Sequence, residues 1–510
     1  MKYIQKLVPV LAVAALLAGP AHAADQPQWG EAWSRNMVSQ EKHLVDGFDP
    51  ATGKNIRWSA DLGTETHGTP MVAAGRVYIG TNNANPRDPK HQGDRGVLMC
   101  LDEKDGHLLW QLVTPKRDED KYYDWPNTGM SSPVTVEGDR VYVVTNRGEV
   151  VCLDANGMAN GNERPYEEES AYLTPHDQTT VTPGPLDGDI LWKLDLPKEA
   201  GIWPHDGAHS SILIHGDYLY LNSGTGVDNT HRLIRTPEAP SLIVIDKKTG
   251  RLVARDDEHI APDIFHCTWS SPALIEVKGR PLIIFCGGNG VIYAFDPIAP
   301  GATTSEVMKL KKVWQFDFDP GAPKKDIHQY LQNRQEGPSD IYGMPVFHEG
   351  RLYVCGGGDV FWGKNEAWLR CIDPSGEGDI TQKGLVWSYA LNKHTMSTAA
   401  VQDGLVYVTD TQNTLHCVDA ISGQGIWTHE MNGSFWASPM VADGKVYVGT
   451  RKGNFAVLAA GREKKVLSNL ELKAPISATT TMANGTVYVA TMKQLFAVAP
   501  KEIPQSASGN

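Results

Sequence analysis

One short pattern of residues recurs along the chain, and it limits the possible folds more than any other feature. Each copy has small residues with proline, a short apolar segment, a glycine turn, a β-rich core, a second glycine turn and an apolar segment ending in aspartate. Runs of this kind bounded by glycine are typical of β-strands. The β-rich core occurs eight times, at residues 77–79, 141–143, 219–221, 283–285, 352–354, 406–408, 446–448 and 487–489.

Eight such units predict an all-β protein, an eight-bladed β-propeller with four-stranded antiparallel blades. The sequence has no long segment of helical periodicity between the units. The last unit starts at Ser477 and ends after Val498 without a fourth strand, whereas residues 53–58 match that strand and carry its tryptophan, Trp58. We therefore expect the N-terminal strand to complete the eighth blade, because closing the ring removes exposed strand edges.

The repeat makes residues 24–510 a single domain, although 510 residues would ordinarily suggest several. Residues 1–23 have the features of a signal peptide: a positive start, an apolar run over 7–18, and small residues up to Ala23. We expect cleavage after Ala23 and a periplasmic or secreted chain with no membrane span or lipid anchor. The net charge of −13 disfavours a nucleic-acid partner.

Seven cysteines are an odd number, so at least one thiol stays unpaired. Six occupy two recurring positions where other units place small apolar residues, which a buried cysteine resembles. These six are Cys100, Cys152, Cys286, Cys355, Cys371 and Cys417. Equivalent positions on different blades do not converge, so we do not expect a cysteine metal cluster. Cys267 lies outside the pattern, and a disulfide there stays open.

The segment Gly-x-x-x-Cys-Leu-Asp, followed by Gly and Trp, resembles the PQQ-like repeat of quinoprotein dehydrogenases and of the outer-membrane assembly lipoprotein with the same propeller. The resemblance covers nearly the whole mature chain. It is strongest to uncharacterised exported PQQ-binding-like propellers, through Trp-Pro-His-Asp at 203–206 and Gly-Val-Asp-Asn-Thr-His at 226–231. It implies that a recurrent tryptophan docks each blade onto its neighbour. The matching residues are Trp58, Trp110, Trp192, Trp314, Trp387 and Trp427.

The same resemblance implies a cofactor. Dehydrogenases of this family hold PQQ over the channel against a tryptophan, with Ca²⁺ and a catalytic aspartate beside it. Trp269 or Trp436 would form that floor, and Asp206 or Asp340 would supply the carboxylate. The sequence departs from the family in having no adjacent cysteine pair, and no Cys-x-x-Cys-His for an attached haem.

Loop lengths indicate which face of the ring carries function. The turns between first and second strands are short. The connections that share the opposite rim are long, at residues 82–95, 224–240 and 358–367 within blades and at 115–128, 197–209 and 319–340 between blades. Long loops on a rigid scaffold are where binding and catalysis concentrate. Residues 160–189 form one insertion that belongs to the other rim.

Residues just before the first strands face the channel at this loop-rich rim, and many are imidazoles, carboxylates or aromatics. We assign catalytic roles to Asp206, His209 and His205, because an aspartate beside an imidazole can orient it or act as a base. The candidate ligand-binding residues are His67, His266, Trp269, Asp340, Tyr342, His394, Trp436 and Arg451. Such a set can bind a polar ligand, coordinate a metal ion from separate blades, or hold a base.

Three functions stay open at this point. The first is a PQQ-type oxidoreductase acting on alcohols or sugars, and the second is a small-molecule site for a different ligand such as a sugar or polyol. The third is a non-catalytic interaction propeller with a protein partner, like the assembly lipoprotein. The missing lipidation cysteine and the histidine-rich mouth favour a small-molecule site at the channel mouth over the third.

Overall fold

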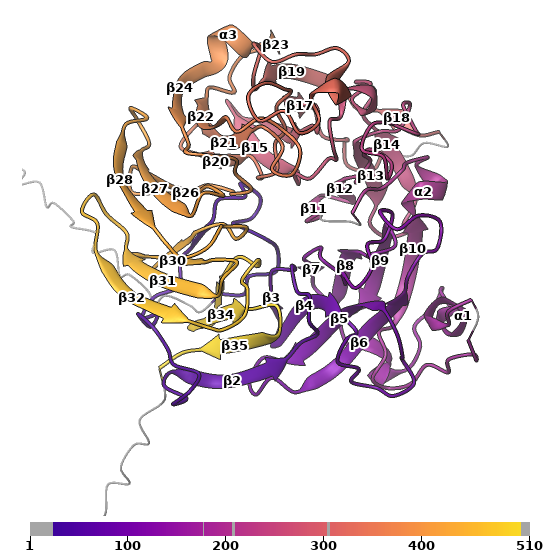
Figure 1. Cartoon of the computed structure of the whole chain (residues 1–510). Helices are drawn as coiled ribbons and strands as arrows, with labels where there is room; N and C mark the ends of the chain where they lie inside the picture. Colours follow the sequence, from indigo (N-terminus) through magenta and orange to yellow (C-terminus); the bar gives the residue numbers. More distant parts are fainter. Residues whose placement is uncertain (1–23, 177, 207–209, 303–305, 501–510) are drawn as a thin grey trace, which may run out of the picture.

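The computed structural model describes residues 24–176, 178–206, 210–302 and 306–500. Within them, eight sheets stand around a common centre, and each contains four antiparallel strands (Figure 1). This is the predicted eight-bladed β-propeller, and each of the eight predicted strand cores lies in the second strand of a blade. None of the helices in the described ranges is long and apolar enough to cross a membrane.

Blades one to four follow the chain from residue 71. Blade one comprises β3 (Met71–Ala73), β4 (Arg76–Asn82), β5 (Arg95–Asp102) and β6 (Leu108–Pro115). Blade two comprises β7 (Thr135–Glu137), β8 (Arg140–Val144), β9 (Glu149–Asp154) and β10 (Ile190–Asp195). Blade three comprises β11 (Leu213–His215), β12 (Tyr218–Asn222), β13 (Leu242–Asp246) and β14 (Leu252–Arg255), with β18 (Met308–Lys309) added at its edge. Blade four comprises β15 (Ala273–Val277), β16 (Arg280–Cys286), β17 (Val291–Phe295) and β19 (Lys312–Asp317), with β23 (Gly378–Asp379) at its edge.

Blades five to eight complete the ring. Blade five comprises β20 (Val346–His348), β21 (Arg351–Gly357), β22 (Ala367–Ile372) and β24 (Leu385–Ala390). Blade six comprises β25 (Ala400–Gln402), β26 (Leu405–Thr409), β27 (Thr414–Asp419) and β28 (Gly425–Glu430). Blade seven comprises β29 (Met440–Ala442), β30 (Lys445–Gly449), β31 (Asn454–Ala459) and β32 (Val466–Glu471). Blade eight comprises β33 (Thr481–Ala483), β34 (Thr486–Ala490), β35 (Gln494–Val498) and the N-terminal β2 (Ile56–Asp61).

The few helices are short and lie in the connections between strands. The insertion between β9 and β10 contains the 3₁₀ turn η1 (Gly157–Asn160) and α1 (Glu169–Leu173). The other helical turns are α2 (Leu196–Glu199), η2 (Ala261–Asp263), η3 (Ile327–Tyr330) and α3 (Thr381–Gly384).

The N-terminal strand closes the ring as expected. β2 pairs antiparallel with β35, with Trp58 opposite Ala497, so indigo and yellow ribbons meet in one sheet (Figure 1). The pairing gives β35 a partner on its outer side, and blade eight then has the same four strands as the others. The prediction that the two ends of the chain share this blade is confirmed.

The recurrent tryptophans dock neighbouring blades. Five of them donate the indole N–H to a backbone carbonyl in the turn between the third and fourth strands of the next blade, at 2.9–3.1 Å. The rings are largely buried, and aromatic rings of this size contribute much of the burial between sheets. The five are Trp58, Trp110, Trp192, Trp387 and Trp427.

All seven cysteines lie in the described residues, and they are buried free thiols. Cys267 is one of them, so the disulfide that the sequence left open does not form. Its sulfur lies 3.5 Å from the carbonyl oxygen of Gly224. The six cysteines of the repeat pack in the apolar layers between blades, as the pattern predicted.

An N-terminal segment that the repeat did not predict occupies the middle of the ring. Residues 26–39 run along the inner edges of the first strands, and β1 (Val38–Ser39) pairs parallel with β29 (Figure 1). Backbone hydrogen bonds also join the segment to β3, β7, β15 and β20. Arg35 is fully buried there, and its guanidinium donates to the carbonyl oxygens of Trp29, Ser211 and Pro272 at 2.9–3.1 Å. We call residues 26–39 the channel segment.

Candidate functional site

A cavity of about 720 Å³ opens at the loop-rich rim of the ring, and we call it the mouth cavity. Trp29 of the channel segment lines it together with residues that precede the first strands of several blades. Residues of the predicted set that line it are His67, Asp206, His266, Trp269, Tyr342, Trp436 and Arg451. The structure therefore brings together seven of the eleven residues singled out from the sequence.

The long connections supply the remaining walls. Tyr122 and Trp125 come from the β6–β7 connection, His231 from the β12–β13 connection, and Phe361 and Trp362 from the β21–β22 connection. Aromatic rings thus surround a space that also receives carboxylate, imidazole and guanidinium groups. Pockets of this size and mixed lining are typical of small-molecule sites.

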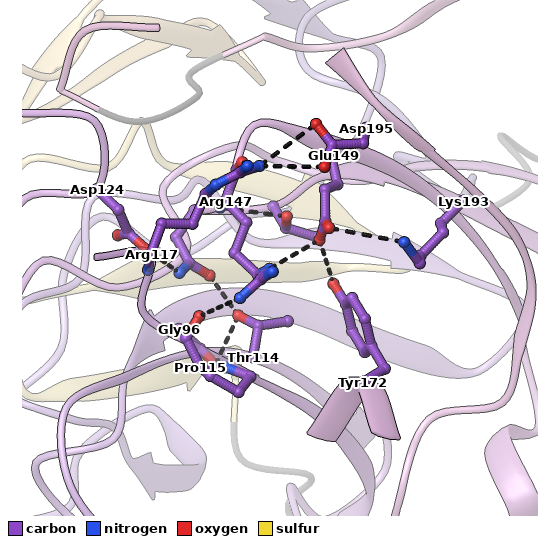
Figure 2. A network of polar contacts seen from close by, with 12 residues as sticks. Gly96, Thr114, Pro115, Arg117, Asp124, Arg147, Glu149, Tyr172, Lys193 and Asp195 are labelled. Carbon is purple, nitrogen blue, oxygen red and sulfur yellow. Dashed lines mark hydrogen bonds and ion pairs between the residues drawn. The ribbon is translucent and has the colours of Figure 1, made fainter. Parts of the chain in front are cut away.

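A polar network holds the β6–β7 connection in place (Figure 2). The Asp124 carboxylate accepts hydrogen bonds from Lys116 Nζ at 2.6 Å and from Asn146 Nδ2 at 2.8 Å. Arg117 Nη1 lies 3.4 Å from the carboxylate of Asp195 at the end of β10. Because these contacts span blades one and two, they fix the loop that presents Tyr122 to the mouth cavity.

Three imidazoles meet at the inner side of the mouth cavity. His205 and His266 are buried, their Nε2 atoms are 3.0 Å apart, and one ring nitrogen of His231 lies within 4.8 Å of both. His205 Nδ1 lies 2.7 Å from the carbonyl oxygen of Val227. The rings stack with aromatic neighbours, and Tyr122 lies parallel to His205 at a centroid distance of 5.5 Å.

Asp359 orients one of these imidazoles. Its carboxylate lies 2.8 Å from His266 Nδ1 and accepts the hydroxyl of Tyr342 and the backbone N–H groups of Phe361 and Trp362. Burial favours the neutral carboxyl, but the charge and hydrogen bond of His266 outweigh it and hold the pKa of Asp359 below its ordinary value. The carboxylate therefore stays ionised and fixes the ring.

In two other carboxyl groups of this region the pKa is raised, in contrast to that of Asp359. Burial raises the pKa of Asp206 to about 6, and its Oδ1 lies 3.7 Å from His205 Nε2. Its backbone has a positive φ of 56° and its N–H donates to the Tyr122 carbonyl at 2.6 Å. Burial and the nearby Asp359 raise the pKa of Asp340 well above its ordinary value.

The opposite wall is built on Trp436. The guanidinium of Arg451 lies 4.4 Å from the ring centroid of Trp436, and the His67 ring stacks on Trp436 at 5.8 Å. Glu65 lies 3.4 Å from His67 and also lines the mouth cavity. This wall therefore offers one cation, one carboxylate and an aromatic surface.

The remaining predicted residues lie elsewhere. His205 is buried behind the wall and reaches the site through the imidazole cluster. Asp340 and His394 are buried in the layer beneath and are not among the lining residues. His209 lies outside the described residues.

Several site residues were not identified from the sequence. The missed residues all lie in the long connections of the loop-rich rim; they are Tyr122, Trp125, His231, Asp359 and Trp362. The signal that could have found them was therefore the length of these loops, combined with their content of aromatic, His and Asp residues.

Comparisons with known proteins agree with the repeat. The family model described as "Outer membrane protein assembly factor BamB" matches residues 94–160 and 365–502. The chain is 23% identical over 440 residues to "Quinohemoprotein alcohol dehydrogenase ADH IIB" of Pseudomonas putida, covering 80% of this chain and 56% of that protein. It is 23% identical over 449 residues to "Quinoprotein alcohol dehydrogenase PedH" of Pseudomonas putida, and this match covers 79% of this chain and 66% of that protein.

The fold itself is matched by a solved structure. BamB from Moraxella catarrhalis superposes with a TM-score of 0.50 at 13% identity, covering 87% of this chain and 97% of that one. The chain spans between half and two thirds of the length of the two dehydrogenases it matches. The repeat, the eight blades and these matches together support a likeness to the PQQ-like β-propeller family.

Proposed function

We propose that the mouth cavity binds a small polar molecule of sugar or polyol size. The observation that carries the proposal is the lining itself, in which aromatic rings alternate with groups that form hydrogen bonds. A sugar presents C–H faces that pack on aromatic rings and hydroxyls that bond to carboxylate, imidazole and guanidinium groups. The volume of about 720 Å³ suits a ligand of one to a few sugar rings.

A screen with purified protein tests this proposal. Glucose, galactose, arabinitol, glycerol and maltose are titrated by calorimetry into the wild-type chain. Trp125 and Phe361 are 39% and 38% exposed on the cavity wall, so Trp125→Ala and Phe361→Ala should fold normally while weakening binding at least about tenfold. Ile421→Ala is the control, because Ile421 is 85% exposed outside the lining.

The result of the screen distinguishes a sugar or polyol site from a protein-interaction surface. Failure of every compound to bind at millimolar concentration would contradict the proposed ligand class. Equal binding by the two wall variants and the control would contradict the proposed location. Co-purification of a protein partner that survives both wall substitutions would instead favour the interaction propeller, which the BamB family match supports.

Quinoprotein oxidation of alcohols or sugars is the second candidate, and the names of the two dehydrogenases favour it. The lining of the mouth cavity does not fit PQQ with Ca²⁺. Arg451 is the one Arg or Lys among the lining residues in the described ranges, whereas PQQ carries three carboxylates. Ca²⁺ takes six to eight oxygen ligands, but the ligand cluster at the mouth cavity consists of three imidazoles.

Reconstitution decides this second candidate. The protein is mixed with PQQ and Ca²⁺, and cofactor absorbance and alcohol- or glucose-dependent dye reduction are followed. The lining predicts neither signal. Both signals together would restore the dehydrogenase function.

Export is a further part of the proposal and rests on residues 1–23, which lie outside the described residues. N-terminal sequencing of the protein recovered from a periplasmic fraction should begin at Ala24. Recovery of an uncleaved chain from the cytoplasm would contradict it.

A further inference from the structure

The three imidazoles of the mouth cavity come from three separate connections. His205 precedes the first strand of blade three, His231 lies between β12 and β13, and His266 precedes the first strand of blade four. Their ring centroids are 4.7–5.2 Å apart. Apolar side chains could fill this space without leaving buried polar atoms that need hydrogen-bond partners. The convergence of three imidazoles therefore needs a chemical explanation.

The hydrogen bonds on the far side of two rings determine where their lone pairs point. A carbonyl oxygen can only accept, so His205 Nδ1, 2.7 Å from the Val227 oxygen, must carry a proton. The Asp359 carboxylate likewise accepts from His266 Nδ1 at 2.8 Å. With both Nδ1 atoms engaged as donors, the two Nε2 atoms face each other at 3.0 Å, and either a proton or a metal ion can lie between them.

Two lone pairs at this distance repel unless something positive lies between or beside them. In a tetrahedral zinc site with Zn–N bonds of about 2.0–2.1 Å, neighbouring ligand nitrogens are about 3.3 Å apart. The observed 3.0 Å is close to that edge length. A shared proton would satisfy this pair alone and would give no reason for a third imidazole and a carboxylate to converge on it.

The surroundings have the form of a second coordination shell. Metal-bound histidines commonly donate their other N–H to a carboxylate or a backbone carbonyl, which fixes the tautomer. His266 donates to Asp359 and His205 to Val227 in this way. Among the described residues Asp359 forms no ion pair with Lys or Arg, and its charged partner is His266 itself.

We propose that His205, His231 and His266 bind one divalent transition-metal ion of the zinc class. Three imidazole nitrogens favour Zn²⁺ over Ca²⁺ or Mg²⁺, which prefer oxygen ligands. Asp206, His231 and His266 line the mouth cavity, so the ion faces the space proposed for the ligand. The metal site does not depend on that ligand and is tested without it.

Metal binding is measured directly on the full chain. The protein is stripped with a chelator, dialysed against Zn²⁺ and analysed by mass spectrometry for bound metal. Co²⁺ is loaded in parallel, because four-coordinate Co²⁺ gives strong visible absorption bands. We expect one ion per chain that survives dialysis.

Four variants locate the site. His231 is partly exposed, so His231→Ala should fold normally, as checked by circular dichroism, yet weaken Zn²⁺ binding at least about 100-fold. His205→Ala should do the same, and Asp359→Asn should weaken binding about 10- to 100-fold while keeping the Co²⁺ bands. His107→Ala is the control, because His107 forms a second, exposed His/Asp group with Asp102 and Asp105 on blade one.

Several results would overturn the proposal. They are no Zn²⁺ retained by the wild type, equal retention by the His231→Ala and wild-type proteins, or loss of metal in His107→Ala instead. If sugar binding persists while no metal is retained, this inference fails and the proposed ligand site stands. If metal binds and no sugar does, the reverse holds.

Discussion

The contact between Trp192 of blade two and Gly250 of blade three sets a specific cost for adding one methyl group. A Cβ built on Gly250 would lie 2.4 Å from Trp192 Cε3 and 2.6 Å from Cδ2, and the φ of Gly250 is +73°. Gly216 in the same blade also has a positive φ, +59°, but its Cβ would meet nothing within 4 Å. A comparison of alanine variants at these two glycines therefore distinguishes the cost of backbone strain from the cost of a packing clash.

The magnitudes follow from that comparison. Placing alanine at a positive φ costs about 1 kcal/mol of folding free energy. Forcing a methyl group into a filled contact adds about 1–3 kcal/mol. We expect Gly216→Ala to lower the free energy of unfolding by about 1 kcal/mol and Gly250→Ala by about 2–4 kcal/mol.

Urea unfolding followed by far-UV circular dichroism measures both variants and a third with Trp192→Ala. Trp192→Ala alone should cost about 3–5 kcal/mol. In that background Gly250→Ala should cost no more than Gly216→Ala, because the indole that it strikes is gone. If Gly250→Ala costs the same with and without Trp192, blade docking through this ring is not the source of the effect.

Three further predictions follow from buried polar groups. Asp124→Ala removes the anchor of the β6–β7 connection, so trypsin should cut at Lys121 at least about tenfold faster, as followed by gel electrophoresis. Burial raises the pKa of Asp189 to about 6, so its ionisation lowers the free energy of unfolding as the pH rises from about 4 to 6. Urea titration should therefore show that Asp189→Asn raises the free energy of unfolding by about 1–2 kcal/mol at pH 8 and changes it little at pH 4. Arg35→Leu removes the donor to the carbonyl oxygens of Trp29, Ser211 and Pro272 and should cost about 3–5 kcal/mol in the same assay.

The sequence predicted the blades because each one repeats the same local requirements. Glycine turns and apolar alternation recur in all eight units and the tryptophan in six, so a weak signal in one copy is supported by the others. Closure by residues 53–58 was predictable for the same reason, since the last repeat lacks the strand that this segment supplies. Residues 26–39 have no counterpart in the repeat, and their bonds to the inner strands are mainly backbone bonds, which leave no side-chain pattern to detect.

The candidate site was predictable in position more than in composition. The rim was identified from loop length, and His205, His266 and Asp206 were identified because they immediately precede first strands, whose direction the repeat defines. His231 and Asp359 lie inside loops of irregular conformation, where no period relates residue number to direction. Their partners lie on other connections: His266, which precedes the first strand of blade four, contacts both, and the Tyr342 hydroxyl that donates to Asp359 precedes the first strand of blade five.

The same difference separates the repeat from the site chemistry. The likeness to known propellers was recognised from strands and turns, whereas every group at the imidazole cluster lies in a connection between strands. Loop residues can change without altering the register of any blade, because each blade is held by its own strand pairing and by tryptophan contacts beneath the rim. A propeller built from this repeat can therefore keep its blades while the connections at its channel mouth bring three imidazoles together.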